Sequence, residues 1–182
     1  LKFPRATKVD SLINSNNNSY QKTTTNLEYI GGIIAPLATS ISFNGYNEDY
    51  HNINLEKVGV FDISSHSGTF NILGRSKLTS LKFIGEINCT LSYPNYNINS
   101  SQRYRNNIRD VEVESINYNQ DFSYWKCLTK QSLLNILNAL VEQPEGTTKT
   151  LTLNTTHHMR ILSDEEKAIA TNKGWTLSEY NA

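Results

Sequence analysis

Short segments in which apolar and polar residues alternate recur along the chain, separated by stretches rich in Asn, Ser and Thr. Four of them have an apolar-x-apolar centre: Val58-x-Val60, Leu81-x-Phe83, Val111-x-Val113 and Leu151-x-Leu153. A period of two is typical of a strand that buries one face. We therefore expect four short strands with these apolar residues inside.

The same segments resemble one another beyond their centres. Stretches at 27–33, 55–63, 78–87 and 108–116 each begin with an apolar residue that is followed by another three positions later, and 150–154 is a shortened copy. The aligned positions are separated by about 23 to 40 residues, as in structural repeats. Because a unit of this size cannot bury its own apolar face, stacked units are needed to form a core. The pattern predicts an irregular solenoid of stacked strands, with an ordinary β-rich domain as the alternative.

The C-terminal region carries the signals of two helices. Thr129 is a suitable N-cap for a first helix, which Pro144 and Gly146 would end. Ser163 and Glu166 have the spacing of a capping box at the start of a second helix.

Gly174 is placed to take the left-handed conformation that ends this second helix, with Trp175 folding back onto Ile169 or Ala170. A strand at 150–153 would lie between the two helices. This order predicts a terminal cap that leaves no open sheet edge.

Two segments resemble a known family. The stretch Leu78–Asn88 reads L-x-x-L-x-F-x-G-x-I-N and resembles the leucine-rich repeats of bacterial BspA-type surface proteins. The segment from Ser132 to the C-terminus is similar to the one that ends such arrays, especially in phage tail and baseplate proteins and in gut-bacterial surface proteins. The resemblance extends from roughly Asn26, although Gly32 replaces an apolar residue in the first copy. It implies an extracellular recognition scaffold on a bacterial cell surface or a virion.

The expected fold class is α+β and β-rich, namely an irregular leucine-rich-repeat-like solenoid closed by a C-terminal helix–strand–helix cap. Its parts would be a polar tail or incomplete repeat at 1–25, the irregular repeat region at 26–128 and the cap at 129–182.

Composition argues against several function classes. The formal net charge is +0 and the pI is about 7.1, so the whole-molecule attraction typical of nucleic-acid binders is missing. No apolar run approaches the roughly 20 residues of a membrane span. Cys89 and Cys127 lack the spacing of zinc ligands, and their pairing as a disulfide stays open.

The residues most suggestive of catalysis have structural explanations. His157 and His158 are adjacent and lack the spacing of a metal-binding pair, so we expect residues of a loop beside a strand. The carboxylates of 164–166 lie in the first turn of the second helix, where the helix dipole stabilises them. We expect no catalytic residue, metal or cofactor, and hence no enzyme; a deep pocket with convergent titratable groups would revive that class.

Two surfaces are candidates for ligand binding. Residues that alternate with the core positions would form an exposed sheet face: Lys57, Phe61, Lys82, Glu112, Glu114, Thr152 and Asn154. On one strand Asp110, Glu112 and Glu114 would point to a single face, with a solvated face as the simpler interpretation. Loop aromatics form the second surface, with burial under the long loops as the alternative: Tyr93, Tyr96, Tyr104, Tyr118, Tyr124 and Trp125.

The sequence favours a non-catalytic recognition or attachment module that binds a protein or a cell-surface glycan, within a larger multi-subunit assembly. The alternative is a purely structural end cap or assembly domain with no ligand of its own.

Overall fold

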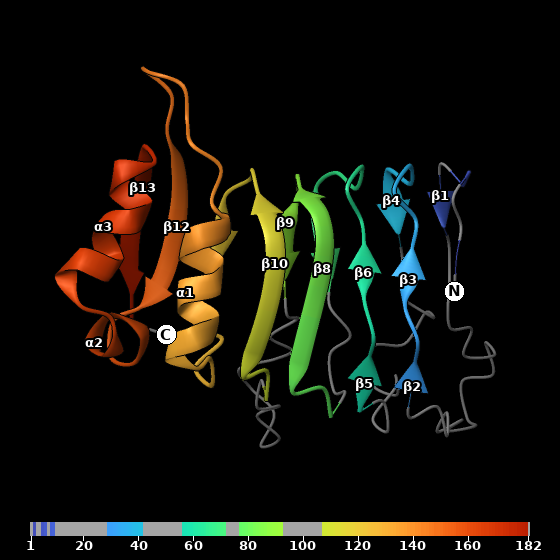
Figure 1. Ribbon diagram of the computed structural model, residues 1–182, viewed down its shortest axis with the longest axis horizontal. Helices are drawn as coiled ribbons and strands as arrows, with labels where there is room; N and C mark the ends of the chain where they lie inside the picture. Colours follow the sequence, from blue (N-terminus) through green and yellow to red (C-terminus); the bar gives the residue numbers. More distant parts are fainter. Residues whose placement is uncertain are drawn as a thin grey trace.

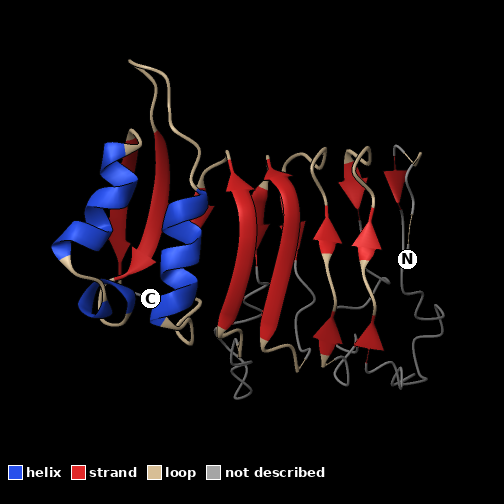
Figure 2. Cartoon of the chain, in the orientation of Figure 1, coloured by secondary structure: helices blue, strands red, loops and turns tan. Residues whose placement is uncertain are grey.

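A computed structural model describes residues 2, 5–6, 8–9, 29–41, 56–71, 77–92 and 107–181 of the chain. The described part is strand-rich with few helices, which confirms the α+β, β-rich class (Figures 1 and 2). Its strands and helices form two layers. Strands that follow one another in the sequence lie side by side within each layer, and all strand pairs are parallel.

The first layer contains a four-stranded sheet, which Figure 1 shows in the foreground. Its strands are, in spatial order, β3 (Ile33–Ile34), β6 (Phe61–Asp62), β8 (Ser80–Ile87) and β10 (Asp110–Ile116). Two short strands precede β3 and β6 and pair with each other: β2 (Tyr29–Ile30) and β5 (Lys57–Val58). At the N-terminal end, Lys2 forms an isolated bridge with Ile34.

The second layer contains the remaining strands. They are β1 (Lys8–Val9), β4 (Ser40–Ile41), β7 (Thr69–Asn71), β9 (Thr90–Ser92), β11 (Gln120–Asp121), β12 (Lys149–Asn154) and β13 (Trp175–Tyr180). β1 pairs with β4, β7 pairs with β9, and the last three form one sheet in the order β11-β12-β13. The Gln120 side chain joins β9 to β11, because it accepts from Leu91 N at 2.9 Å and donates to Cys89 O at 2.7 Å.

Helices take the place of strands in the first layer after β10. They are α1 (Lys130–Ala139), α2 (His158–Ile161) and α3 (Asp164–Asn172). α1 packs beside β10 and α3 packs against α1 and β13, so that β12 and β13 lie behind the helices (Figures 1 and 2). Lys173 Nζ donates to Asn138 O at 2.5 Å and to Leu140 O at 2.8 Å, which satisfies carbonyl groups at the end of α1.

The apolar core lies between the two layers. Phe61 of β6 stacks on Phe83 of β8 with ring centroids 5.2 Å apart, and meets Phe70 of β7 edge to face at 5.7 Å. All three rings are buried. Complete burial of such a side chain contributes about 1.5–3 kcal/mol, so these aromatic contacts hold the two layers together.

The predicted strand centre Val58-x-Val60 is wrong in register. Val58 is buried, but Val60 is half-exposed and Phe61 points inward instead. Gly59 and Val60 separate β5 from β6, and Gly59 N donates to Ile30 O at 2.8 Å. A Cβ atom at Gly59 would lie 2.0 Å from Gly31 O, so this close approach requires glycine. Because of this break between β5 and β6, Phe61 points inward, although the alternation from Val58 would place Val60 inside and Phe61 outside.

The third and fourth copies of the pattern form neighbouring strands of the first sheet, whereas the fifth copy belongs to the other layer. Leu81 and Phe83 lie in β8 and pair in register with Val111 and Val113 of β10. Leu81, Phe83 and Val111 are buried, but Val113 is half-buried. Leu151 and Leu153 are buried in β12, which pairs with β11 and β13 rather than with the first sheet.

The local helix signals are confirmed. The Thr129 hydroxyl accepts from Ser132 N at the start of α1, and Ser163 and Glu166 form both bonds of a capping box at the start of α3. Gly174 has a φ of 78° and donates from its N–H to Thr171 O.

The end of α1 and the segment after α3 differ from the prediction. α1 ends at Ala139 rather than at Pro144, because Leu140 is extended and bridges with Ile116 of β10. Trp175 begins β13, a strand that the sequence analysis did not predict, and its indole Nε1 donates to Val141 O at 2.7 Å. β13 is also the last strand of its sheet, so the cap moves the sheet edge to β13 instead of removing it.

Side chains of α1 close the edge of β10. The Ser132 hydroxyl accepts from Val111 N at 2.9 Å and donates to Arg109 O at 2.8 Å. Asn135 Nδ2 donates to Val111 O at 3.1 Å. These are the kinds of bonds that another parallel strand would supply, so two helical side chains replace a strand at this edge.

Candidate functional site

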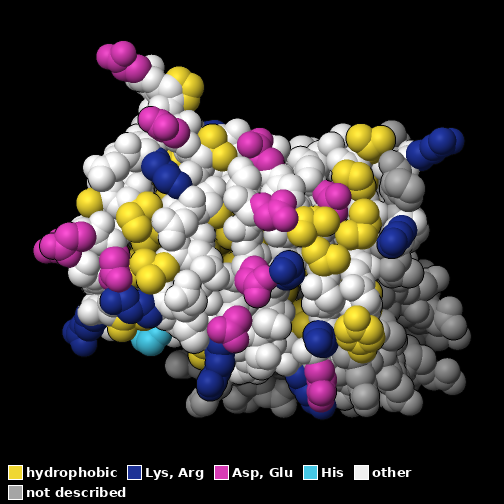
Figure 3. All heavy atoms as spheres, in the orientation of Figure 1, with side chains coloured by type: hydrophobic (Ala, Val, Ile, Leu, Met, Phe, Trp, Pro, Cys, Tyr) yellow, Lys and Arg dark blue, Asp and Glu magenta, His cyan; other side chains and the backbone are white. Residues whose placement is uncertain are grey.

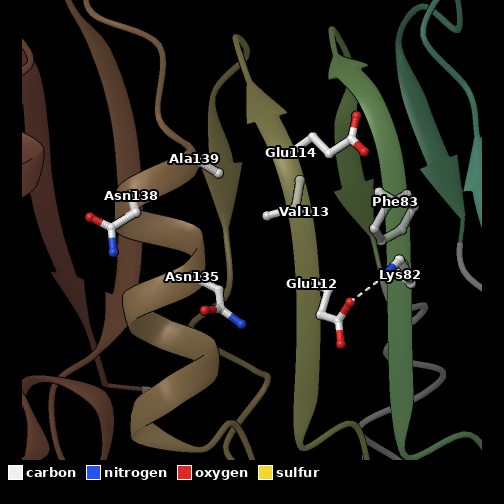
Figure 4. A pocket seen from close by; sticks show the side chains of 8 residues that line it. All are labelled: Lys82, Phe83, Glu112, Val113, Glu114, Asn135, Asn138 and Ala139. Atoms are coloured by element: carbon white, nitrogen blue, oxygen red, sulfur yellow. Dashed lines mark hydrogen bonds and ion pairs between the residues drawn. The ribbon is translucent and has the colours of Figure 1, made fainter.

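An open groove of about 510 Å³ lies between the outer side of the first sheet and α1 (Figure 4). Three elements line it, with Lys82 and Phe83 from β8, Glu112, Val113 and Glu114 from β10, and Asn135, Asn138 and Ala139 from α1. Its floor is the sheet, and α1 forms one wall because this helix stands where a further strand would be. The groove therefore marks the boundary between the strand-built and the helix-built parts of the first layer.

The charged side chains of the groove interact with one another. Lys82 Nζ lies 2.7 Å from Glu112 Oε2, and this hydrogen bond with the Glu112 carboxylate is the main reason that the pKa of Lys82 is raised. Glu114 Oε2 accepts from Gly85 N at 2.7 Å. Neither Glu114 nor Asp110 has a cation within ion-pair distance in the described part of the chain. The outer side of β10 therefore has an excess of negative charge.

Asn135, Asn138 and Ala139 of α1 form the wall of the groove, and they differ in how they are held. Asn135 is held on both sides, because it donates to Val111 O and its Oδ1 accepts from Gln131 Nε2 at 3.0 Å. Ala139 points from α1 toward the groove in Figure 4. Asn138 is exposed at the edge of the wall. The wall is thus partly rigid, and in Figure 4 the Asn138 amide points away from β10.

The structure brings together three of the residues expected on the exposed sheet face. Lys82, Glu112 and Glu114 line the groove, and the prediction that Asp110, Glu112 and Glu114 share one exposed face is confirmed. Lys57 is exposed on β5 with its Nζ 6.0 Å from the centre of the Tyr29 ring. Thr152 is half-buried on β12, in the other layer.

Three proposed surface residues are buried, which corrects those predictions. Phe61 is 1% exposed because of the irregularity at Gly59, and Trp125 is 1% exposed and packs edge to face on Phe122 at 4.9 Å. Asn154 is 0% exposed: its Nδ2 donates to Ser123 O at 3.1 Å, and its Oδ1 accepts from His157 N at 2.9 Å. This asparagine organises the turn after β12 instead of facing a ligand.

The remaining loop aromatics are only partly described. Tyr118 and Tyr124 are exposed, and the Tyr124 ring lies 5.9 Å from that of Tyr180 at the end of β13. Hydrogen bonding with Tyr180 is the main reason that the pKa of Tyr124 is raised. Tyr93, Tyr96 and Tyr104, like His51, lie outside the described residues.

His158 is a buried structural residue and not the loop residue that the sequence suggested. Its Nδ1 accepts from Asn154 N at 3.1 Å and its Nε2 lies 2.9 Å from Trp125 O, so the neutral ring carries its proton on Nε2. Burial lowers the pKa of His158 to about 4. The ring joins β12 to the turn that contains Trp125, while His157 is half-buried beside it.

Other candidate chemistry is limited in the described part of the chain. No group of three or more His, Cys, Asp or Glu side chains there could hold a metal ion. Cys89 and Cys127 are free thiols; Cys89 is buried, which raises its pKa to about 12, and Cys127 is exposed. Glu166 belongs to the capping box and pairs with Lys130 at 2.9 Å. These structural contacts explain its position without a catalytic role.

The helix residues of the groove were missed by the sequence analysis. The available signal was a polar stripe on an otherwise apolar helix, since Ser132, Asn135 and Asn138 recur at intervals of three. That spacing places them on one face but does not reveal that the face meets β10.

Comparisons of the chain with protein-family models, with curated proteins and with solved structures gave no match. Among the described residues, every helix is too short or too polar to cross a membrane.

Proposed function

We propose that this chain is a non-catalytic recognition module of a phage tail or of a bacterial cell-surface protein, and that it binds a protein or a cell-surface glycan outside the cell. The observation that carries the proposal is the groove at the end of the first sheet. Charged side chains of β8 and β10 lie there on an open surface beside the wall of α1, while the inward residues of the same strands form the core.

We also propose that the stacked strands are an irregular leucine-rich-repeat-like solenoid. Three observations support this. Ile33, Phe61, Phe83 and Val113 align across four neighbouring parallel strands. Each strand of the four-stranded sheet is followed in the chain by a strand of the second layer: β3 by β4, β6 by β7, β8 by β9 and β10 by β11. Before β3 and β4, Lys2 bridges Ile34 of the first layer and β1 pairs with β4 of the second layer, both in parallel. An incomplete repeat within residues 1–25 would make these same two contacts.

A specific observation favours the alternative function, a structural end cap. Ser132 and Asn135 satisfy backbone groups of β10 that would otherwise pair with a further strand. α1 therefore has a structural task at the place where the groove is found. The two functions are compatible. A recognition module binds a ligand at the groove, whereas a structural cap alone does not, so a ligand screen distinguishes them.

The test is a screen of protein, peptide and glycan arrays with the purified chain and two variants. Ala139→Gln extends a neutral side chain into the groove, and Ala168→Gln makes the same change at a half-exposed position of α3. We expect at least one ligand that Ala139→Gln loses and Ala168→Gln keeps. A ligand set that both variants bind equally would contradict the groove as the recognition site, and chemical turnover of the bound ligand would contradict a non-catalytic function.

A further inference from the structure

Apolar side chains adjoin the groove on the outer side of the first sheet. Ile34, Val60 and Ile84, here called the apolar patch, are half-exposed. Ile34 and Ile84 flank Asp62 in register across β3, β6 and β8, and each is next in sequence to a residue that points into the core. A Cβ atom at Gly32 would lie 2.9 Å from Val60 Cγ1, so glycine leaves room for Val60 over the sheet. Figure 3 shows hydrophobic side chains gathered on this face.

Carboxylates border the apolar patch on the side of the groove. The acidic column, defined as Asp110, Glu112 and Glu114 of β10, is exposed, and Lys82 is the nearest cation through its pair with Glu112. Figure 3 shows acidic and hydrophobic side chains next to each other over these strands. Because the whole chain has a formal net charge of +0, this negative charge is a local feature of the face. Such a face attracts a basic partner and repels an acidic one.

We infer that the face formed by the apolar patch, the acidic column and the groove binds an extended protein segment that carries aliphatic side chains followed by a basic side chain on one of its two sides. This inference rests on the proposed function and names the class of its ligand. Aliphatic side chains of the segment would cover Ile34 and Ile84, and a basic side chain would meet Glu114 beside the wall of α1. The partner supplies the positive charge that Asp110 and Glu114 lack within the described part of the chain.

The dimensions of the face agree with an extended segment. Neighbouring strands are about 4.8 Å apart, so the distance from β3 to β10 is roughly 14 Å. Side chains on one side of an extended chain recur about every 6.8 Å, and five residues therefore span the face. A segment of about ten residues would cross it completely and reach α1.

The test measures binding of three synthetic peptides, each about ten residues long, by fluorescence anisotropy with the full chain. In the first, the Leu–Lys peptide, every second residue follows the order Leu, Leu, Lys, and Ser fills the positions between them, so that Leu and Lys lie on one side. The second, the Leu–Glu peptide, has Glu in place of Lys, and the third, the Ser–Lys peptide, has Ser in place of Leu. We expect the Leu–Lys peptide to bind about tenfold more tightly than either other peptide, and less tightly as the salt concentration rises. If the Ser–Lys peptide binds as tightly as the Leu–Lys peptide, the apolar patch does not contribute to binding. If the Leu–Glu peptide binds as tightly, the acidic column does not contribute.

Matched variants locate the binding. The double variant Glu112→Gln and Glu114→Gln keeps the hydrogen-bond acceptors but removes two charges, and should weaken Leu–Lys binding about tenfold. Glu145→Gln, in the exposed turn before β12, is the control and should leave binding unchanged. Ile84→Ser should weaken binding of the Leu–Lys peptide and not that of the Ser–Lys peptide. Equal effects of the double variant and of Glu145→Gln would overturn the inference.

Two other occupants are distinguishable outcomes. If Ala139→Gln abolishes binding of a glycan while the Leu–Lys peptide binds no more tightly than its controls, the proposed function stands and this inference fails. If sedimentation shows a dimer that Ile84→Ser dissociates, a second copy of the chain covers the face and the inference also fails. If neither peptides nor array ligands respond to the face variants, both proposals fail together.

Discussion

In the described residues from 29 to 121 the first layer consists of strands, whereas in residues 122–181 the helices α1 and α3 occupy the corresponding place in front of β12 and β13 (Figure 2). A strand obtains its hydrogen bonds from the backbone of the next strand, almost independently of its side chains. At the change from strand to helix those partners end, and the side chains of Ser132 and Asn135 supply them. The boundary therefore depends on individual side chains, and it is also where the groove forms.

The two regions also differ in their outer surfaces. The strand-built region exposes the apolar patch and the acidic column on a broad sheet face. The first turn of α3 instead carries carboxylates that the capping box and the helix dipole explain. Acidic clusters in the two regions thus have different causes, and only the one on the sheet face adjoins apolar residues and a groove. The predictions below test this division, in order of decreasing effect.

Phe83→Ala should have the largest effect, because the Phe83 ring joins β8 to Phe61 in the aromatic core of the strand-built region. We expect a loss of about 3–5 kcal/mol in the free energy of unfolding, measured by chemical denaturation. Ile84→Ala removes a neighbouring side chain from the outer side of the same strand and should cost about 1 kcal/mol or less. Similar losses for both variants would mean that the assignment of inner and outer sides is wrong.

His158→Gln should reduce the pH dependence of stability in the helix-built region. Burial lowers the pKa of His158 to about 4, whereas the ordinary value of histidine is 6.5. Between these values the unfolded chain binds a proton that the folded chain does not, so this contribution to stability is complete above pH 6.5 and decreases as the pH falls to 4. The difference corresponds to about 3 kcal/mol.

The measurement is the free energy of unfolding at several pH values between 7 and 4. His157→Gln is the control, because His157 is half-buried and lacks the two bonds that His158 makes. We expect a shallower pH dependence in His158→Gln and the wild-type dependence in His157→Gln. A shallower pH dependence in His157→Gln, with the wild-type dependence in His158→Gln, would contradict the assignment of this effect to His158.

Ser132→Ala tests the side-chain closure of β10 directly. Loss of the hydroxyl leaves Val111 N without its acceptor in a buried position, and we expect a cost of about 1–3 kcal/mol. Ser123 offers a matched control, because it is equally buried but its hydroxyl has no hydrogen-bond partner among the described residues. Ser123→Ala should change stability by less than about 0.5 kcal/mol, since no bond is lost. Equal costs in thermal denaturation would show that α1 covers β10 by packing alone.

Ser163→Ala should have the smallest effect of the series. It removes the side-chain half of the capping box at the start of α3, for an expected cost of about 0.5–2 kcal/mol. Thr171→Ala changes another exposed hydroxyl of the same helix and should not destabilise it, because alanine has the higher helix propensity. If thermal denaturation ranks the two variants in the reverse order, the box does not stabilise α3.

Features with local causes were predicted from the sequence, whereas features with long-range causes were not. The caps at Thr129 and Ser163 involve bonds within one turn, so a few residues suffice to predict them. The shared face of Asp110 and Glu114 follows from strand alternation. These features required no knowledge of neighbouring units.

Features that depend on neighbouring units were missed. The inward position of Phe61 results from the contact between Gly59 and Gly31, which lies between β2 and β3, and a single segment does not reveal this contact. β13 forms because it pairs with β12, although its residues follow a helix end that was predicted correctly. The groove needs α1 beside β10, and the bonds of Asn135 across this contact are long-range.

If the ligand binds at the boundary between the two regions, amide hydrogen exchange with and without the Leu–Lys peptide will locate it there. We predict slower exchange on binding in 80–86, 110–115 and 135–139, which carry the face and the groove wall. Exchange in 118–125 and 176–180, around the exposed pair Tyr124 and Tyr180, should stay unchanged. Protection confined to those tyrosine segments, with none in β8, β10 or α1, would contradict binding at this boundary.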